Sequence, residues 1–155
     1  MNTNRVSRVY GVVQSTVFII FALVILLDRS RPLLVSQAPA LRWLGTGFAV
    51  AGVVVMLVAI RTIGRSIQIE PAPKATATLT TSGIYRWLRH PIYTGIVLIV
   101  IGLFLRQCTV LVAAAAIGVV GFLLVKSRFE ERLLLARYPE YARYRRRSWG
   151  IVPFL

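Results

Sequence analysis

Four long stretches of this sequence carry almost no charge, and they constrain the fold more than any other feature. A bilayer core about 30 Å thick is crossed by roughly 20 helical residues, and backbone with unpaired polar groups cannot lie in lipid. The stretches therefore predict an all-α integral membrane protein with four transmembrane helices, at about 9–27, 43–60, 91–105 and 108–128. Because only Arg106 and Gln107 separate the last two apolar stretches, we expect these helices to form a tight antiparallel hairpin.

The composition supports a membrane protein. Hydrophobic residues make up 57% of the chain and charged residues only 15%, with a mean hydropathy of +0.71. The first stretch is long and no small-residue cleavage site follows it, which favours a retained helix over a cleaved signal peptide. No linker divides the sequence, so we expect one membrane-embedded domain over 1–155, ending in a cytoplasmic helical tail at 129–155.

The charge distribution predicts an orientation. The chain has 19 Lys and Arg against five Asp and Glu, and an even number of spans places 15 basic residues on one side and four on the other. The positive-inside rule then puts both termini and the 61–91 loop in the cytoplasm of a cell-membrane protein. A basic membrane face attracts anionic lipid headgroups. No nucleic-acid module accompanies the charge, so membrane lipids are the expected partners and nucleic acid is not. The oligomeric state stays open.

Small residues recur at helical spacing within the apolar stretches. Gly45 and Gly52 share a face of the second predicted helix, and Gly95 and Gly102 share a face of the third. Gly118 and Gly121 thin the fourth helix in the same way. Close backbone approach drives helix association in lipid, so we expect these faces to meet.

Chemically versatile side chains are few. The only cysteine, Cys108, excludes an intrachain disulfide and a multi-cysteine metal site, and we expect no metal. The only histidine, His90, follows Arg89 at the start of the third predicted helix. Glu130 and Glu131 follow the apolar part of the fourth helix, and the hairpin returns them to the same membrane face.

This proximity predicts a mixed-charge cluster at one end of the bundle, surrounded by aromatic residues (Tyr85, Tyr93, Tyr141 and Tyr144). A simpler alternative is a solvated helix face. Lys126 lies four residues before Glu130, and Arg128 lies three residues before Glu131, as in ordinary ion pairs on a helix surface. The residue types and their spacing leave both interpretations open.

Two motifs resemble the isoprenylcysteine carboxyl methyltransferase family and the related phospholipid and phosphatidylethanolamine N-methyltransferases. The first, G-x-Y-x-x-x-R-H-P-x-Y-x-G, is matched by Gly83, Tyr85, Arg89, His90, Pro91, Tyr93 and Gly95. The second is a Glu-Glu pair, a Tyr-x-x-Tyr segment, a basic run and a late proline. It is matched by Glu130, Glu131, Tyr141, Tyr144, Arg147 and Pro153. The resemblance covers roughly residues 45–155.

The resemblance implies an S-adenosyl-L-methionine-dependent integral membrane methyltransferase. The cofactor-binding residues that it implies are Tyr85, His90, Pro91, Tyr93, Gly95, Glu130 and Glu131. The implied catalytic residues are Arg89, Glu131 and Arg147. The implied substrate-binding residues are Arg89, Tyr141, Tyr144 and Arg147.

The resemblance also bears on the methyl acceptor. It implies methyl transfer to a hydrophobic, lipid-like small molecule at the cytoplasmic face, with carboxyl O-methylation of an isoprenylcysteine-like substrate as the leading hypothesis. A phospholipid-type N-methyltransferase is one alternative. A non-catalytic membrane protein that binds anionic lipid or a partner is another. A transporter is disfavoured, since no ionisable residue falls near the middle of the bilayer.

Overall fold

Helices account for nearly all of the described chain. The computed structural model describes residues 3–30, 32–33, 39–64 and 79–151. In chain order the elements are α1 (Thr3–Leu27), α2 (Pro39–Ile63), the short 3-10 helix η3 (Gly83–Arg86), α3 (Pro91–Gln107), α4 (Val110–Arg137) and α5 (Tyr141–Arg145). The predicted all-α class is confirmed.

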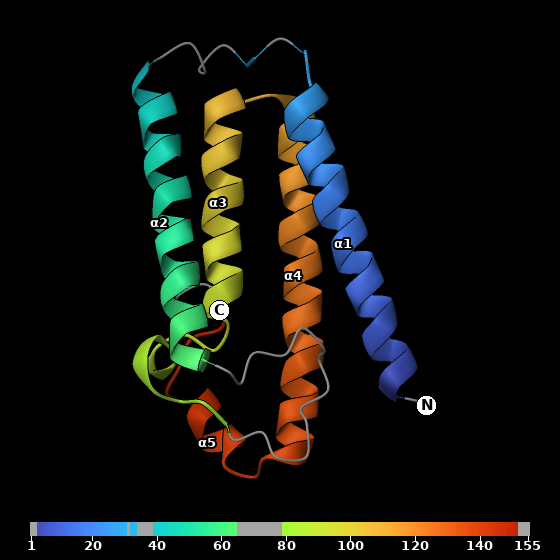
Figure 1. Ribbon diagram of the computed structural model, residues 1–155, viewed down its shortest axis with the longest axis vertical. Helices are drawn as coiled ribbons and strands as arrows, with labels where there is room; N and C mark the ends of the chain where they lie inside the picture. The colour runs from blue at the N-terminus through green and yellow to red at the C-terminus, as the bar shows by residue number, and fades with distance from the viewer. Residues whose placement is uncertain (1–2, 31, 34–38, 65–78, 152–155) are drawn as a thin grey trace.

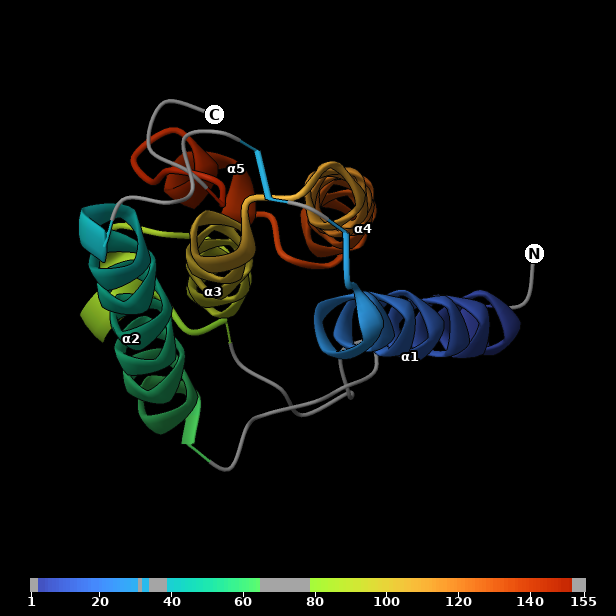
Figure 2. The same cartoon turned by 90° about the horizontal axis from the view of Figure 1, so that it is seen from above.

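The four long helices stand side by side and alternate in direction (Figure 1). One end of the bundle carries the end of α1, the start of α2 and the α3–α4 turn. The opposite end carries η3, the start of α3 and α5. Seen from above, α2 lies beside α3 and α1 lies beside α4 (Figure 2). The bundle therefore consists of two helix pairs that are joined through α3 and α4.

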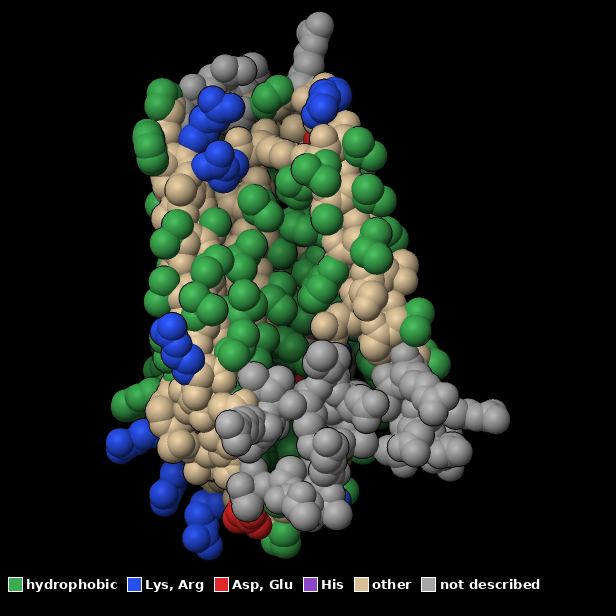
Figure 3. Space-filling view, viewed as in Figure 1, with side chains coloured by type: hydrophobic (Ala, Val, Ile, Leu, Met, Phe, Trp, Pro, Cys, Tyr) green, Lys and Arg blue, Asp and Glu red, His purple; other side chains and the backbone are tan. Residues whose placement is uncertain are grey.

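Within the described residues, three helices are long and apolar enough to cross a membrane: Val9–Leu27 within α1, Pro39–Ile63 and Val110–Arg137. The fourth helix, α3, is also apolar but has only 17 residues. Apolar side chains cover much of the outer face of the bundle, as lipid contact requires (Figure 3). The protein is thus an integral membrane protein with three long apolar helices and one shorter one.

The structure corrects several predicted helix bounds. Helix α2 runs from Pro39 to Ile63 instead of 43–60. Proline is tolerated in the first turn of a helix, so Pro39 can begin α2. Arg61 lies in the last turn, where its long side chain can extend its charge away from the apolar core of the membrane. The hairpin turn lies at Cys108–Thr109, not at Arg106–Gln107. Cys108 adopts a left-handed conformation with φ 52° that ends α3, and Thr109 Oγ1 caps α4 by accepting a bond from Val112 N.

The predicted glycine contacts hold for α2 and α3 only. Gly45 lies opposite Gly102, and Gly52 lies opposite Gly95. A Cβ at any of these four positions would lie 2.5–2.7 Å from the backbone oxygen of the opposite glycine. The same expectation is wrong for α4, where a Cβ at Gly118 or Gly121 would meet nothing within 4 Å.

The interior joins the remaining elements. A buried apolar cluster takes residues from α1, α3, α4 and the C-terminal segment: Phe21, Val97, Val100, Val119, Leu123 and Ile151. Thr94 of α3 donates a hydrogen bond to the backbone oxygen of Ile151. The C-terminal segment is therefore anchored beside the start of α3, where the predicted site residues lie.

Candidate active site

The segment before α3 is held by the tail. Pro91 occupies the first turn of α3, where its missing N–H costs no hydrogen bond, and it is fully buried. Leu88 and Trp149 form a parallel β-bridge in which Trp149 N donates to Trp87 O over 2.9 Å. Arg89 N donates to Trp149 O over 2.7 Å. The backbone of Arg89 is thus fixed by residues that lie far away in the sequence.

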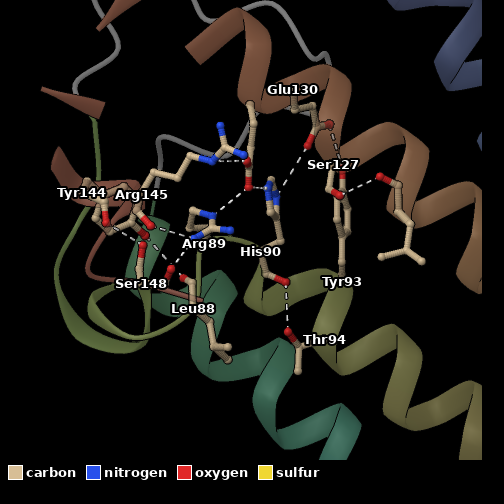
Figure 4. A network of polar contacts seen from close by, with 12 residues as sticks. Leu88, Arg89, His90, Tyr93, Thr94, Ser127, Glu130, Tyr144, Arg145 and Ser148 are labelled. Atoms are coloured by element: carbon tan, nitrogen blue, oxygen red, sulfur yellow. Dashed lines mark hydrogen bonds and ion pairs between the residues drawn. The ribbon is translucent and has the colours of Figure 1, made fainter. Parts of the chain in front are cut away.

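The Arg89 side chain is the centre of a buried polar network (Figure 4). Its Nε lies 2.7 Å from Glu131 Oε1, and its Nη1 donates to the backbone oxygens of Arg145, over 3.0 Å, and of Ser148. The side chain is only 10% exposed. One guanidinium group therefore links α3 to α4 and to the tail.

Glu131 is held through both of its carboxylate oxygens. Besides Arg89, Oε1 contacts His90 Nε2 at 3.3 Å, and Oε2 contacts Arg145 Nε at 3.1 Å. The side chain is 10% exposed. The predicted proximity of Arg89 and His90 to Glu131 is confirmed, and the solvated-face alternative is wrong for this residue. Removing one partner of a buried ion pair typically costs about 3–5 kcal/mol.

Glu130 belongs to a second group of contacts. Tyr93 donates its hydroxyl to Glu130 Oε1 over 2.7 Å, and Lys126 Nζ lies 3.5 Å from the same oxygen. Oε2 has a longer contact, 3.8 Å to His90 Nδ1. Lys126 is only 4% exposed and also donates to Gln14 of α1. The spacing of four residues from Lys126 to Glu130 does give an ion pair, but the pair is largely buried.

The two carboxylates therefore differ in their availability. Among the described residues, both oxygens of Glu131 have partners at 3.3 Å or less, whereas the only contact of Glu130 Oε2 is the one at 3.8 Å. The Glu130 side chain is also more exposed, at 18%. A carboxylate oxygen can accept more than one hydrogen bond. Glu130 therefore has the more available carboxylate oxygen of the pair.

The four predicted tyrosines surround the network. Tyr93 stacks on the His90 ring at 5.4 Å between centroids, and Tyr144 donates its hydroxyl to the backbone oxygen of Tyr85. Tyr141 is 1% exposed, and its hydroxyl has no hydrogen-bond partner in the described part of the chain. Burial raises the pKa of Tyr85, Tyr141 and Tyr144, so these phenols stay protonated at neutral pH.

Two predicted site residues lie apart from the network. Arg147 is exposed and lines an open cavity of about 520 Å³ together with Trp87 and Tyr144. Gly95 faces α2, so its missing side chain is explained by helix packing in this structure. Its predicted cofactor contact remains a prediction. Pro153, the last residue of the second motif, lies outside the described residues.

The structure also adds residues that the motifs did not indicate. Arg145, Ser148 and Lys126 each contact a site residue directly. Arg145 lies in a run of arginines, and the sequence contains no signal that selects which of them turns toward Glu131. Lys126 could have been found from its position inside the last apolar turns of α4. Within the described ranges, no group of three or more His, Cys, Asp and Glu could hold a metal ion.

Together these features define a membrane-embedded helical protein with a buried ionic site at one end of a helix hairpin. The sequence model of the phospholipid methyltransferase family matches residues 40–141, and the chain belongs to this family of membrane methyltransferases. The family resemblance predicted from the two motifs is confirmed.

Two individual proteins illustrate the relationship. The cobalt-zinc-cadmium resistance protein CzcN of Cupriavidus metallidurans is 33% identical over 102 residues, which are 63% of this chain and 46% of that protein. The structure of a eukaryotic intramembrane Ras methyltransferase, isoprenylcysteine carboxyl methyltransferase, matches with a TM-score of 0.69 at 22% identity. The matched region covers 96% of this chain and 53% of the methyltransferase chain. The structural likeness shows a common fold, and the chain spans about half the length of both proteins.

Proposed function

We propose that this protein transfers a methyl group from S-adenosyl-L-methionine to a hydrophobic, lipid-like acceptor at the cytoplasmic membrane face. The observation that carries the proposal is the buried contact of Arg89, His90 and Glu131, with Glu130 beside it. These residues come from the two motifs that the chain shares with membrane methyltransferases. A network that buries several charges at a helix end is costly to maintain for stability alone, which supports a role in binding.

The chemistry of the side chains fits the methyl donor. S-adenosylmethionine carries an ammonium, a carboxylate and an adenine ring, and it supplies a methyl group on a positively charged sulfur. We propose that Glu130 accepts the ammonium, since its Oε2 is the carboxylate oxygen with spare capacity. His90 would bind the carboxylate. Tyr85, Pro91 and Tyr93 would form an apolar wall for the adenine, with Gly95 allowing close approach.

Arg89 and Glu131 would act mainly by fixing this geometry. Their pairing holds the tail against α4 and the start of α3, and positioning contributes much of the rate in bimolecular transfers. Arg147 and Tyr144 line the neighbouring open cavity. We propose that the acceptor's polar group binds there, with Arg147 orienting the acceptor oxygen. Tyr141, which lies on α5 with Tyr144, would complete the substrate site.

The state of Glu131 favours a carboxylate acceptor. Methylation of a carboxylate needs no proton removal, whereas an amine must lose a proton to a base. Glu131 is held by two arginines and His90, so it is poorly placed to take a proton. We therefore propose carboxyl O-methylation of an isoprenylcysteine-like molecule. The phospholipid methyltransferase family model favours N-methylation of a phospholipid as the second candidate, with His90 as base.

We also propose the orientation of the chain. The 17 residues of α3 rise about 26 Å, close to the thickness of a bilayer core, so all four long helices would cross the membrane within one domain over 1–155. The start of α1, the segment before α3 and α5 lie at one end of the bundle (Figure 1). The predicted excess of basic residues at this end supports a cytoplasmic location for both termini.

Calorimetric titration of the purified protein with S-adenosylmethionine and S-adenosylhomocysteine tests the proposal. We expect micromolar binding of both compounds, weakened at least about tenfold by Glu130→Gln through loss of a charge-assisted bond. Glu140→Gln is the matched control for cofactor binding, because Glu140 is an exposed acid that lines the proposed acceptor cavity and not the buried network. Absence of binding in both detergent and lipid nanodiscs would reject the enzyme and favour a non-catalytic lipid- or partner-binding protein.

A further inference from the structure

A polar cavity of about 290 Å³ lies at the end of the bundle opposite the Arg89 network. It is bounded by the end of α1, the start of α2 and the α3–α4 turn. Three of its lining residues are Arg29, Arg42 and Arg106, which come from three different parts of the chain. Basic side chains are visible at this end of the space-filling view, over α2 and at the end of α1 (Figure 3).

Positive charges outnumber negative charges among the described residues that line this cavity, even though Arg29 interacts electrostatically with Asp28. Asp28 also lines it, but its carboxylate accepts hydrogen bonds from Ser30 N, over 2.9 Å, from Ser30 Oγ and from Thr109 Oγ1. Bonds from Ser30 and Thr109 lower the pKa of Asp28, so it is ionised. Within the described ranges, none of the three arginines forms an ion pair. Three positive charges and one negative charge thus share the cavity.

Membrane topology does not account for these arginines. Only four basic residues of the chain fall on this side of the predicted bundle, and three of them line the one cavity. The positive-inside rule disfavours basic residues on the side away from the cytoplasm. Trp43 is 75% exposed next to Arg42, as expected for an aromatic anchor at the level of the lipid headgroups.

We propose that this cavity binds a phosphate group, either of a membrane phospholipid or of free phosphate. Guanidinium groups match phosphate oxygens in geometry and charge, and three of them around one cavity give a multidentate site. Gln107, also in the lining, donates from Nε2 to Ile25 O, while its buried Oε1 has no partner in the described part of the chain. A hydroxyl or ammonium next to the phosphate would satisfy this acceptor. The site is independent of methyl transfer.

The test compares two triple variants with equal change in charge. Arg29→Gln, Arg42→Gln and Arg106→Gln together remove the cavity's cations, while Arg61→Gln, Arg128→Gln and Arg132→Gln together remove three exposed arginines elsewhere. Each full-length protein in detergent is titrated with phosphatidylglycerol, with diacylglycerol of the same chains, and with inorganic phosphate. Thermal unfolding reports binding, since a ligand of the native state raises Tm.

We expect phosphatidylglycerol affinity to fall at least about tenfold in the cavity variant, the effect of losing a charge-assisted bond, and to change little in the control. If the triple variant does not fold, Arg42→Gln alone replaces it, because no side-chain bond of Arg42 is found in the described ranges. Equal losses in both triple variants, or equally strong binding of diacylglycerol, would overturn the proposal. Competition by millimolar inorganic phosphate would identify free phosphate as the ligand, and lack of competition would identify the phospholipid.

Discussion

Helix α3 contacts α2 and α4 by opposite means. Against α2 it packs backbone to backbone through four glycines, with no room for one added carbon atom. Against α4 it is joined by a two-residue turn at one end and by the contacts of Arg89 and His90 with Glu131 at the other. Between these two points the α3–α4 contact is made by large apolar side chains of the buried cluster.

The two contacts of α3 therefore depend on different properties of the side chains, one on their volume and the other on their charge. The α2–α3 contact depends on volume, so it is disturbed by any larger residue and is indifferent to pH and salt. The network end of the α3–α4 contact depends on complementary charges in a buried place, where loss of one partner leaves the other uncompensated. A bundle held in both ways can keep its helices together while the polar end is altered, and four variants test this.

The largest effect is expected from Arg89→Ala. This change leaves the Glu131 carboxylate buried with a missing partner and also removes the bonds to the tail, at a cost of about 3–5 kcal/mol in the free energy of unfolding. Chemical denaturation in detergent measures the loss, and limited proteolysis reports release of the tail. Arg128→Ala, at an exposed position of α4, is the control. Equal stability of the two variants would show that the buried charge pair is not needed.

Gly52→Leu comes next. A side chain here must displace the backbone oxygen of Gly95, 2.5 Å from the new Cβ, so we expect about 1–3 kcal/mol of destabilisation from overpacking. Thermal unfolding followed by tryptophan fluorescence measures it. Gly118→Leu introduces the same side chain where nothing lies within 4 Å, and it should leave the unfolding temperature nearly unchanged. A similar loss in both variants would mean that leucine itself is the cause.

Tyr141→Phe should act in opposite directions on stability and binding. Removing a buried hydroxyl that lacks a partner stabilises the free protein by about 1 kcal/mol, whereas binding weakens if a ligand uses that hydroxyl. Denaturation and calorimetry on the same samples measure both quantities. Because burial raises the pKa of Tyr141, the stability due to the neutral phenol is complete below about pH 10 and is lost at higher pH. The loss of stability at alkaline pH should be absent from Tyr141→Phe. If this loss persists in the variant, other titratable groups cause it.

The smallest effect is expected from Gly118→Ala. Glycine in a helix interior is less favourable than alanine by roughly 0.5–1 kcal/mol, and the site has space for a methyl group. The variant should therefore unfold at a slightly higher temperature than the unmodified protein. Gly102→Ala makes the same exchange within the α2–α3 contact, where a Cβ would lie 2.5 Å from Gly45 O, and it should be destabilising.

Much of the fold follows from local sequence signals. Uncharged stretches locate the long helices. The Tyr138-Pro139 pair marks the end of α4, because a residue before proline avoids the helical conformation, and Tyr138 is extended. The hairpin brings Arg89 and His90 to Glu131 because one turn joins their helices. These features depend on chain neighbours or on one short connection, which a sequence displays directly.

Other features depend on contacts that no local signal specifies. The small residues of α4 resemble those of α2 and α3, yet only the latter meet, because partner choice depends on the arrangement of the whole bundle. Arg145 and Arg147 belong to the same basic run, but Arg145 at the end of α5 contacts Glu131, whereas Arg147 lines the open cavity beside Tyr144. Ser82 precedes η3 as a residue type that often caps helices, but its side chain makes no capping bond there.

The bridge between Leu88 and Trp149 has a consequence for the order of events during synthesis. The ribosome makes Arg89 well before Arg145 and Ser148, whose backbone oxygens its guanidinium requires. At about 5–20 residues per second, that interval lasts roughly 3–12 s. The helices can insert and pair during this time, but the site closes only when the tail arrives. A chain interrupted within the tail would therefore reach the membrane as an inserted bundle without a finished site.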